Sequence, residues 1–162
     1  MVEPEASLPE VNVQPGESHL VRNPTILRTI LGSCVGVTFF ARRLGIAALC
    51  HPMLPRAPDN SLMIGEEGRR YVDFAIRDLA RQFDFCRVRR ADVEVKLFGG
   101  GDVLSVMNES SRPTVGRMNC EAALYVLNEE GFHVSASSLG GTCGLHIQFN
   151  TGTGEVLLRR LS

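Results

Sequence analysis

With 162 residues, of which 44% are hydrophobic and 22% charged, the chain has the composition of a single globular domain. A formal net charge of −1 offers no basic field for nucleic acid, and the lack of Trp with only two Tyr leaves few aromatic platforms for bases. The five cysteines are odd in number and form no C-x-x-C pair, which argues against both a disulfide framework and a zinc module.

The N-terminal region differs in composition from the rest. Residues 1–16 contain three prolines and three glutamates, so we expect a flexible segment there and a single domain over residues 17–162. This acidic, proline-interrupted start does not have the pattern of a signal peptide. Arg28, Arg42 and Arg43 interrupt the longest apolar stretch, which argues against a membrane span. We therefore expect the protein in a reducing cytoplasm.

Two apolar runs, residues 35–40 and 46–49, flank a short polar break and predict a β-hairpin. If its turn is centred within the arginine pair of that break, the numbers of paired residues sum to 85, and Cys34 lies directly opposite His51. Opposed residues have Cβ atoms about 4.5–5.5 Å apart, which would let the imidazole take the proton of the thiol. Cys34 and His51 are therefore the candidate nucleophile and acid/base. A register slip of one residue would send them to opposite faces.

Each of these residues also has a structural interpretation. A free cysteine is usually a small buried hydrophobe, and a histidine at a strand end is often a surface residue. Strand alternation directs Cys50 to the face opposite His51, so we expect Cys50 in the core. A metal site at Cys50 and His51 lacks a spaced second pair of ligands. The other histidines that could pair with Cys34 are His19, His133 and His146.

The rest of the chain mixes helical and strand patterns. Residues 71–83 have helical spacing, and a second helix is expected from about residue 118 to a C-terminal cap at Gly131. Residues 93–97 alternate as a strand that ends in the glycines at 99–101, which allow tight backbone near a site or simply a turn. Many short strands with two helices indicate an α+β domain with antiparallel or mixed sheet.

Two motifs resemble a known family. L-G-S-C-V-G-V at residues 31–37 and H-P-M-L-P at residues 51–55 are similar to the CheD family of chemoreceptor glutamine deamidases, and so is the 17-residue separation of Cys34 and His51. Further agreement comes from F-G-G-G, V-G-R-M-N, G-G-T-C-G and F-N-T-G-T-G. The similarity covers nearly everything after the first twenty residues.

The resemblance implies a cysteine hydrolase that converts glutamines of methyl-accepting chemotaxis receptors to glutamates. It assigns the nucleophile to Cys34 and the acid/base to His51. The third catalytic residue of the family, a threonine on the strand before the cysteine, corresponds to Thr29, although in some members it stands one position earlier, where this chain has Arg28. The resemblance also implies a β-sandwich-like core of antiparallel or mixed sheets with about two to three flanking helices.

The residues before the candidate nucleophile are small. Gly32 and Ser33 let backbone approach a substrate closely, and we expect N–H groups here to bind the oxyanion. No cofactor and no metal are expected. The implied partners are chemoreceptor helices and a CheC-type phosphatase. The alternative to an enzyme is a non-catalytic interaction module that binds receptors or such a phosphatase without turnover.

Overall fold

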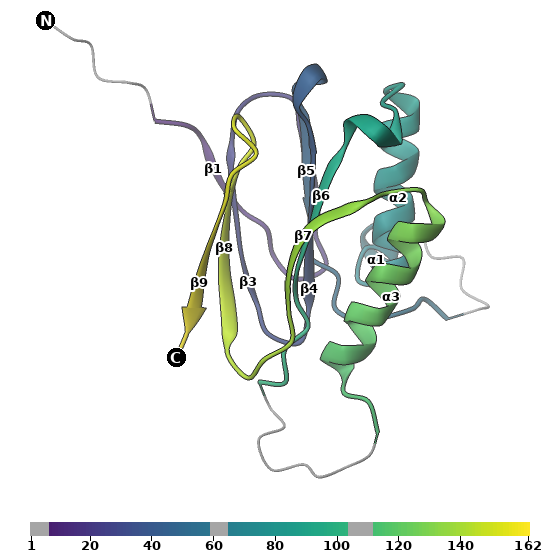
Figure 1. Cartoon of the computed structure of the whole chain (residues 1–162), viewed down its shortest axis with the longest axis vertical. Coiled ribbons are helices and arrows are strands. Elements are labelled where there is room, and N and C mark those ends of the chain that lie inside the picture. Colours follow the sequence, from purple (N-terminus) through teal and green to yellow (C-terminus); the bar gives the residue numbers. More distant parts are fainter. Residues whose placement is uncertain (1–6, 59–64, 104–111) are drawn as a thin grey trace, which may run out of the picture.

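The computed structural model describes residues 7–58, 65–103 and 112–162. Two β-sheets face each other, and the helices cover the outer face of one of them (Figure 1). The expected α+β class, with mixed sheets in a sandwich-like core and two to three flanking helices, is confirmed. None of the helices in the described part of the chain is long and apolar enough to cross a membrane.

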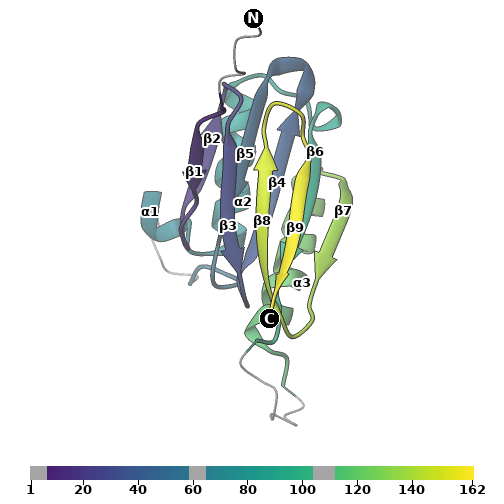
Figure 2. The same cartoon turned by 90° about the vertical axis from the view of Figure 1, so that its left-hand side faces the viewer.

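The four-stranded sheet faces the viewer in Figure 2. Its order is β1-β3-β8-β9, and only β1 runs parallel to its neighbour. The strands are β1 (Glu10–Asn12), β3 (Ile26–Leu31), β8 (Gly144–Asn150) and β9 (Val156–Leu161). Along β3 the buried positions alternate, because one face of this sheet packs on the core and the other faces solvent.

The first strand lies inside the segment that the sequence led us to expect as flexible. Residues 10–12 pair with β3, and the following Val13 is only 3% exposed. Its backbone N–H also donates to the carbonyl of Arg28. At these residues the structure therefore differs from the expectation, since a three-residue strand between prolines is too short to show a periodic pattern. Residues 1–6 of that segment lie outside the described residues.

The five-stranded sheet has the order β2-β5-β4-β6-β7, and β7 runs parallel to β6. Its strands are β2 (Ser18–Val21), β5 (Ile46–Cys50), β4 (Val35–Ala41), β6 (Glu94–Gly99) and β7 (Val134–Leu139). Every residue of the two central strands β4 and β5 is buried. These strands lie between the helices and the other sheet, which is why they read as continuous apolar runs and not as alternating ones.

Strands β4 and β5 form the expected hairpin, but in a different register. Val37 pairs with Cys50, so the numbers of paired residues sum to 87. The turn comprises a 3₁₀ turn, η1 (Arg42–Leu44), and Gly45, whose φ of 65° lies in the left-handed region that favours glycine. The centre of the turn therefore lies one residue later than expected.

This register removes Cys34 and His51 from direct opposition. Extending the ladder sets the position of Cys34 across from Met53, so the prediction that Cys34 faces His51 directly is wrong. Because paired positions shift by two residues, the alternation of the side chains is unchanged. Both residues are still directed toward the four-stranded sheet: Cys34 packs on the core between the sheets, and His51 contacts Thr29 of β3.

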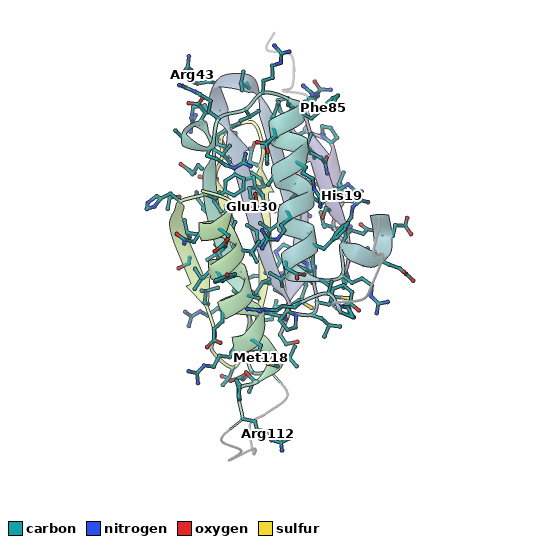
Figure 3. The ribbon with its side chains drawn as sticks, turned by 90° about the vertical axis from the view of Figure 1, so that its right-hand side faces the viewer. His19, Arg43, Phe85, Arg112, Met118 and Glu130 are labelled. Carbon is teal, nitrogen blue, oxygen red and sulfur yellow. The ribbon has the colours of Figure 1, made fainter. Side chains whose placement is uncertain are left out.

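Three helices are present in the described residues: α1 (Gly65–Gly68), α2 (Val72–Phe85) and α3 (Val115–Glu129). Figure 3 shows α2 and α3 side by side over the five-stranded sheet. Helix α3 begins earlier than expected, because the hydroxyl of Thr114 caps it by accepting from the N–H of Arg117 at 3.2 Å. The expected glycine cap is confirmed, since Gly131 follows the helix with a φ of 81°.

Two hydrophobic cores hold the layers together. One lies between the helices and the five-stranded sheet and contains Cys50, as expected from strand alternation. Its aromatic centre is formed by Phe39, Phe83 and Phe132. The other lies between the two sheets. Strands β4 and β5 contribute to both cores, so their ends are held in place from two sides.

Candidate active site

The candidate residues lie at the open end of the β4–β5 hairpin. Cys34 lies in the loop between β3 and β4 and is half-buried, whereas His51 directly follows β5 and is 1% exposed. The two chain segments are joined by a backbone hydrogen bond from Val35 N–H to the carbonyl of Pro52, at 3.4 Å. The hairpin ladder therefore pairs Val35 with Pro52, the residues that directly follow Cys34 and His51.

Thr29 of β3 contacts the ring of His51. Its Oγ1 lies 2.6 Å from His51 Nδ1 and 2.7 Å from the carbonyl oxygen of Val13. A carbonyl can only accept, so the threonine hydroxyl donates its single hydrogen to Val13. The same oxygen must then accept from His51, which places the ring proton on Nδ1 and leaves Nε2 with a free lone pair.

The same geometry decides between the two positions considered for the threonine. Along β3, Thr29 is buried and points inward, whereas the adjacent Arg28 points to the other face and pairs with Glu10 at 2.9 Å. The chain thus brings Thr29, and not the residue one position earlier, to the histidine.

His51 is neutral near pH 7. Burial lowers the pKa of its imidazole to about 4, and the hydrogen bonding to Val13 and the charge of Glu17 only partly oppose this effect. Its Nε2 is buried and has no hydrogen-bond partner among residues 7–58, 65–103 and 112–162. A neutral imidazole with a free, unprotonated nitrogen can act as a general base.

Cys34 is protonated in this environment. Burial raises the pKa of its thiol, and its own backbone N–H opposes the shift only in part. The pair is therefore a neutral thiol and a neutral imidazole, not a thiolate–imidazolium ion pair. Such a thiol becomes nucleophilic when a base removes its proton during attack.

Cys34 and His51 line two different clefts. Cys34 lines one of about 680 Å³, whose walls include Met53, Leu54 and the first turn of α3. His51 lines another, of about 390 Å³, together with Thr29 and Val13. The sulfur and the imidazole are thus approached from separate clefts, and the wider one gives access to the sulfur.

The glycine run after β6 packs against the loop of Cys34. The N–H of Gly100 donates to the carbonyl of Cys34 at 2.8 Å, and that of Gly101 donates to the carbonyl of Gly32 at 2.9 Å. Gly99 has a φ of 101°, and a Cβ there would collide with the carbonyl oxygen of Cys34. These glycines allow a close approach of backbone to the candidate site.

Gly32 and Ser33, the expected oxyanion-binding residues, line the same cleft as Cys34 and are half-buried. Sequence reasoning missed a further residue in contact with them: Asn119 of α3, which donates to the carbonyls of Ser33 and Met53. The sequence pattern that could have indicated Asn119 is its helical spacing: it lies three positions from each of the buried residues Gly116 and Ala122, on the same face of the helix.

The structure does not support the other histidines as partners of Cys34, nor a metal site at Cys50 and His51. Among the described residues, His19, His133 and His146 make no hydrogen bond to Cys34; His19 pairs with Glu17 at 3.1 Å. Cys50 lies in the helix-side core while His51 faces Thr29, so these neighbours point to opposite sides of the sheet. Two side chains in that arrangement cannot ligate a common metal ion.

Comparison with known proteins gives a consistent result. The CheD family, described as "CheD chemotactic sensory transduction", matches residues 53–160. The "Probable chemoreceptor glutamine deamidase CheD 2" of Geobacter sulfurreducens is 43% identical over 155 residues, covering 96% of this chain and 92% of that protein. The "Probable chemoreceptor glutamine deamidase CheD" of Oleidesulfovibrio alaskensis is 37% identical over 161 residues, covering 98% and 76%.

A solved structure shows a similar fold. The hypothetical protein YfiH of Bacillus licheniformis superposes with a TM-score of 0.52 at 10% identity, covering 77% of this chain. The chain spans about half the length of that protein, 51%. At this identity the likeness concerns the fold alone.

Proposed function

The chain belongs to the CheD family, and on that premise we propose that it is a protein-glutamine glutaminase that converts glutamine side chains of chemoreceptors to glutamate. The observation that carries this proposal is the hydrogen bond from His51 to Thr29. It leaves Nε2 of a neutral imidazole free at the end of the hairpin where Cys34 lies. Cys34 is the nucleophile, His51 the acid/base and Thr29 the residue that orients the ring.

The first step forms a thioester. Nε2 of His51 takes the proton of the Cys34 thiol while the sulfur attacks the side-chain carboxamide carbon of the glutamine. The carbonyl oxygen of the amide becomes an oxyanion, which backbone N–H groups of the loop with Gly32 and Ser33 stabilise. As the carbon–nitrogen bond breaks, Nε2–H returns its proton to the leaving group, and ammonia is released.

The second step regenerates the enzyme. His51 takes a proton from a water molecule, whose oxygen attacks the thioester carbon. The carbon–sulfur bond then breaks, the sulfur recovers the proton from His51, and glutamate remains on the receptor. One amide and one water thus yield one carboxylic acid and one ammonia, and no oxidant, metal or cofactor is consumed.

The wider cleft suits a projecting side chain. Its walls around Cys34 are largely apolar, and a glutamine on the surface of a receptor helix can enter it end-on. The substrate is therefore an exposed glutamine on a chemoreceptor helix. A reducing compartment keeps a free cysteine nucleophile in its thiol form, which agrees with a cytoplasmic location. Binding of a CheC-type phosphatase stays a prediction from the resemblance.

The test is mass spectrometry of a chemoreceptor's cytoplasmic fragment after incubation with the enzyme. We expect conversion of specific glutamines by the wild type and none by Cys34→Ala. Cys143→Ala is the matched control, because Cys143 is an exposed cysteine in the β7–β8 turn and does not line the cleft of Cys34. If wild type and Cys34→Ala leave the same glutamine content while both bind the fragment, the protein is a non-catalytic interaction module.

A further inference from the structure

The loop that carries Cys34 has three consecutive carbonyl groups held by hydrogen bonds. Gly101 N–H holds the first, at Gly32, and Gly100 N–H holds the third, at Cys34. The middle carbonyl, at Ser33, accepts from Nδ2 of Asn119 at 2.9 Å. Backbone N–H groups hold the outer two carbonyls, whereas only the middle one is held by a side chain, that of Asn119.

Asn119 also holds the segment that follows the histidine. Its Nδ2 donates to the carbonyl of Met53 at 3.0 Å, two residues after His51. Both acceptors are carbonyl oxygens, which cannot donate, so the amide nitrogen must face them. One side chain of α3 thus joins the loop of the candidate nucleophile to the loop of the candidate base.

The side-chain oxygen of Asn119, by contrast, lacks a hydrogen-bond partner among the described residues. Asn119 is fully buried, so its Oδ1 is a buried acceptor. A buried acceptor without a donor destabilises the folded state. Helix α3 also carries Gly116 one turn earlier, where a Cβ would collide with the carbonyls of Gly100 and Gly101. Glycine there lets the short asparagine reach the loop.

The hydrogen bond to Ser33 also sets the direction of the next N–H group. In a planar trans peptide the N–H points opposite to the preceding carbonyl, so fixing Ser33 C=O toward Asn119 turns the N–H of Cys34 away from it. Among residues 7–58, 65–103 and 112–162, no other residue accepts from this N–H. It lies beside its own sulfur, where the oxyanion of an attacked carbonyl would form.

We propose that Asn119 is a positioning residue that holds the Ser33–Cys34 peptide so that the Cys34 N–H serves as an oxyanion donor. This inference rests on the proposed function, because it concerns the acylation of Cys34. It goes further by naming a residue outside the Cys34–His51–Thr29 set and the group through which it acts.

The test compares two reactions of the same sulfur. Acylation by p-nitrophenyl acetate passes through an oxyanion, whereas alkylation by iodoacetamide does not. We expect Asn119→Ala and the isosteric Asn119→Asp to lower the acylation rate at least about 10-fold more than the alkylation rate, since one donor is typically worth 10²–10³ in rate. Cys34→Ala gives the background from other groups. Asn128→Ala, at an exposed asparagine of the same helix, is the control and should change neither rate.

A purely structural role predicts a different result. If both rates fall by the same factor, or neither falls, the inference is wrong. A measurement on the wild type covers the case in which both Asn119 variants fail to fold: reaction with a small aldehyde gives a thiohemiacetal, and the amide hydrogen of Cys34 should then exchange more slowly with solvent. Unchanged exchange in the adduct would overturn the proposal.

Neither reagent is a receptor, so these outcomes are independent of the proposed function. If the Asn119 variants have a lower ratio of acylation to alkylation but the wild type leaves receptors unmodified, the deamidase function is refuted and the role of Asn119 is kept. If the wild type modifies receptors but the ratio is unchanged in the variants, the deamidase function is kept and the role of Asn119 is refuted.

Discussion

The clefts at the two ends of the β4–β5 hairpin are similar in size, but they differ in whether the polar atoms around them have hydrogen-bond partners. Arg43, at the closed end, and Met118, near the open end, lie at opposite ends of the molecule in Figure 3. The closed end borders a cleft of about 650 Å³, and the open end one of about 680 Å³. At the closed end two arginines that line the cleft are paired: Arg90 donates to Asp84 at 2.8 Å, and Arg42 donates to the carbonyl of Thr153 at 3.1 Å.

At the open end, buried polar atoms are left without partners. Nε2 of His51 and Oδ1 of Asn119 have none among the described residues. Unpaired buried polar groups cost stability, so these two atoms beside the candidate residues agree with a functional site there. The size of a cleft therefore does not distinguish the two ends of this hairpin, whereas the pairing of polar atoms does.

The largest effect should come from replacing His51, the proposed base at the open end. His51→Gln keeps a polar side chain but cannot exchange protons, so we expect kcat for receptor deamidation to fall by about 10³–10⁴-fold. Receptor binding should persist, because Cys34 and its cleft remain. A deamidation rate within 10-fold of the wild type, measured by ammonia release, would contradict the assignment of His51 as acid/base.

A smaller effect should follow from changing Thr29, which we propose orients the ring of His51. Thr29→Val removes the hydroxyl at nearly constant shape, and with it the hydrogen bonds that join it to His51 Nδ1 and to the Val13 carbonyl. We expect kcat to fall by about 10²-fold and the free energy of unfolding to fall by about 1–3 kcal/mol. Thr29→Ser keeps the hydroxyl and serves as the control, with kcat within a few-fold of the wild type. Equal losses in the two variants would mean that packing of the methyl group matters, not the hydrogen bond.

His51 should also make stability depend on pH. Its pKa is about 4 in the folded protein against 6.5 for the free group, so between these values the unfolded chain binds more protons. The free energy of unfolding therefore has its full value, as far as His51 is concerned, above pH 6.5. It falls as the pH drops from 6.5 through 4, and the total loss is roughly 3 kcal/mol. Urea unfolding at pH 7 and pH 4 measures it, as the difference between the wild type and His51→Gln. An equal pH dependence in both proteins would contradict a buried neutral His51.

The smallest effect is expected at the closed end. Arg42→Ala removes a contact of the guanidinium with the ring of Phe40 and a hydrogen bond to Thr153. We expect about 0.5–1 kcal/mol lower stability and an unchanged kcat for deamidation. Chemical denaturation and the ammonia-release assay check both values. A large fall in kcat would show that the closed end takes part in the reaction, and the contrast between the two ends would be lost.

Some of this arrangement is predictable from the sequence. The two apolar runs predicted the hairpin, and strand alternation placed Cys50 in the core. The same alternation separates Thr29 from Arg28, because Leu27 and Leu31 mark the inward face of β3. The register was wrong because the turn is four residues long, with Gly45 in a left-handed conformation.

Other features depend on contacts between distant parts of the chain. The pairing of residues 10–12 with β3 has no local signature in so short a strand. Asn119 reaches Ser33 and Met53 across 86 and 66 residues of sequence. Helical spacing can mark Asn119 as a polar residue on a buried face, but only the packing of α3 on the sheet shows which carbonyls it holds.

The most direct measurement is the ¹⁵N NMR spectrum of the histidine rings, of which the chain has four, with His51→Gln to assign the signals of His51. Between pH 6 and 8 we expect a neutral His51 ring protonated on Nδ1 and unprotonated on Nε2. A ring protonated on Nε2, or one that is charged at pH 7, would contradict the account of His51 as the base that activates Cys34.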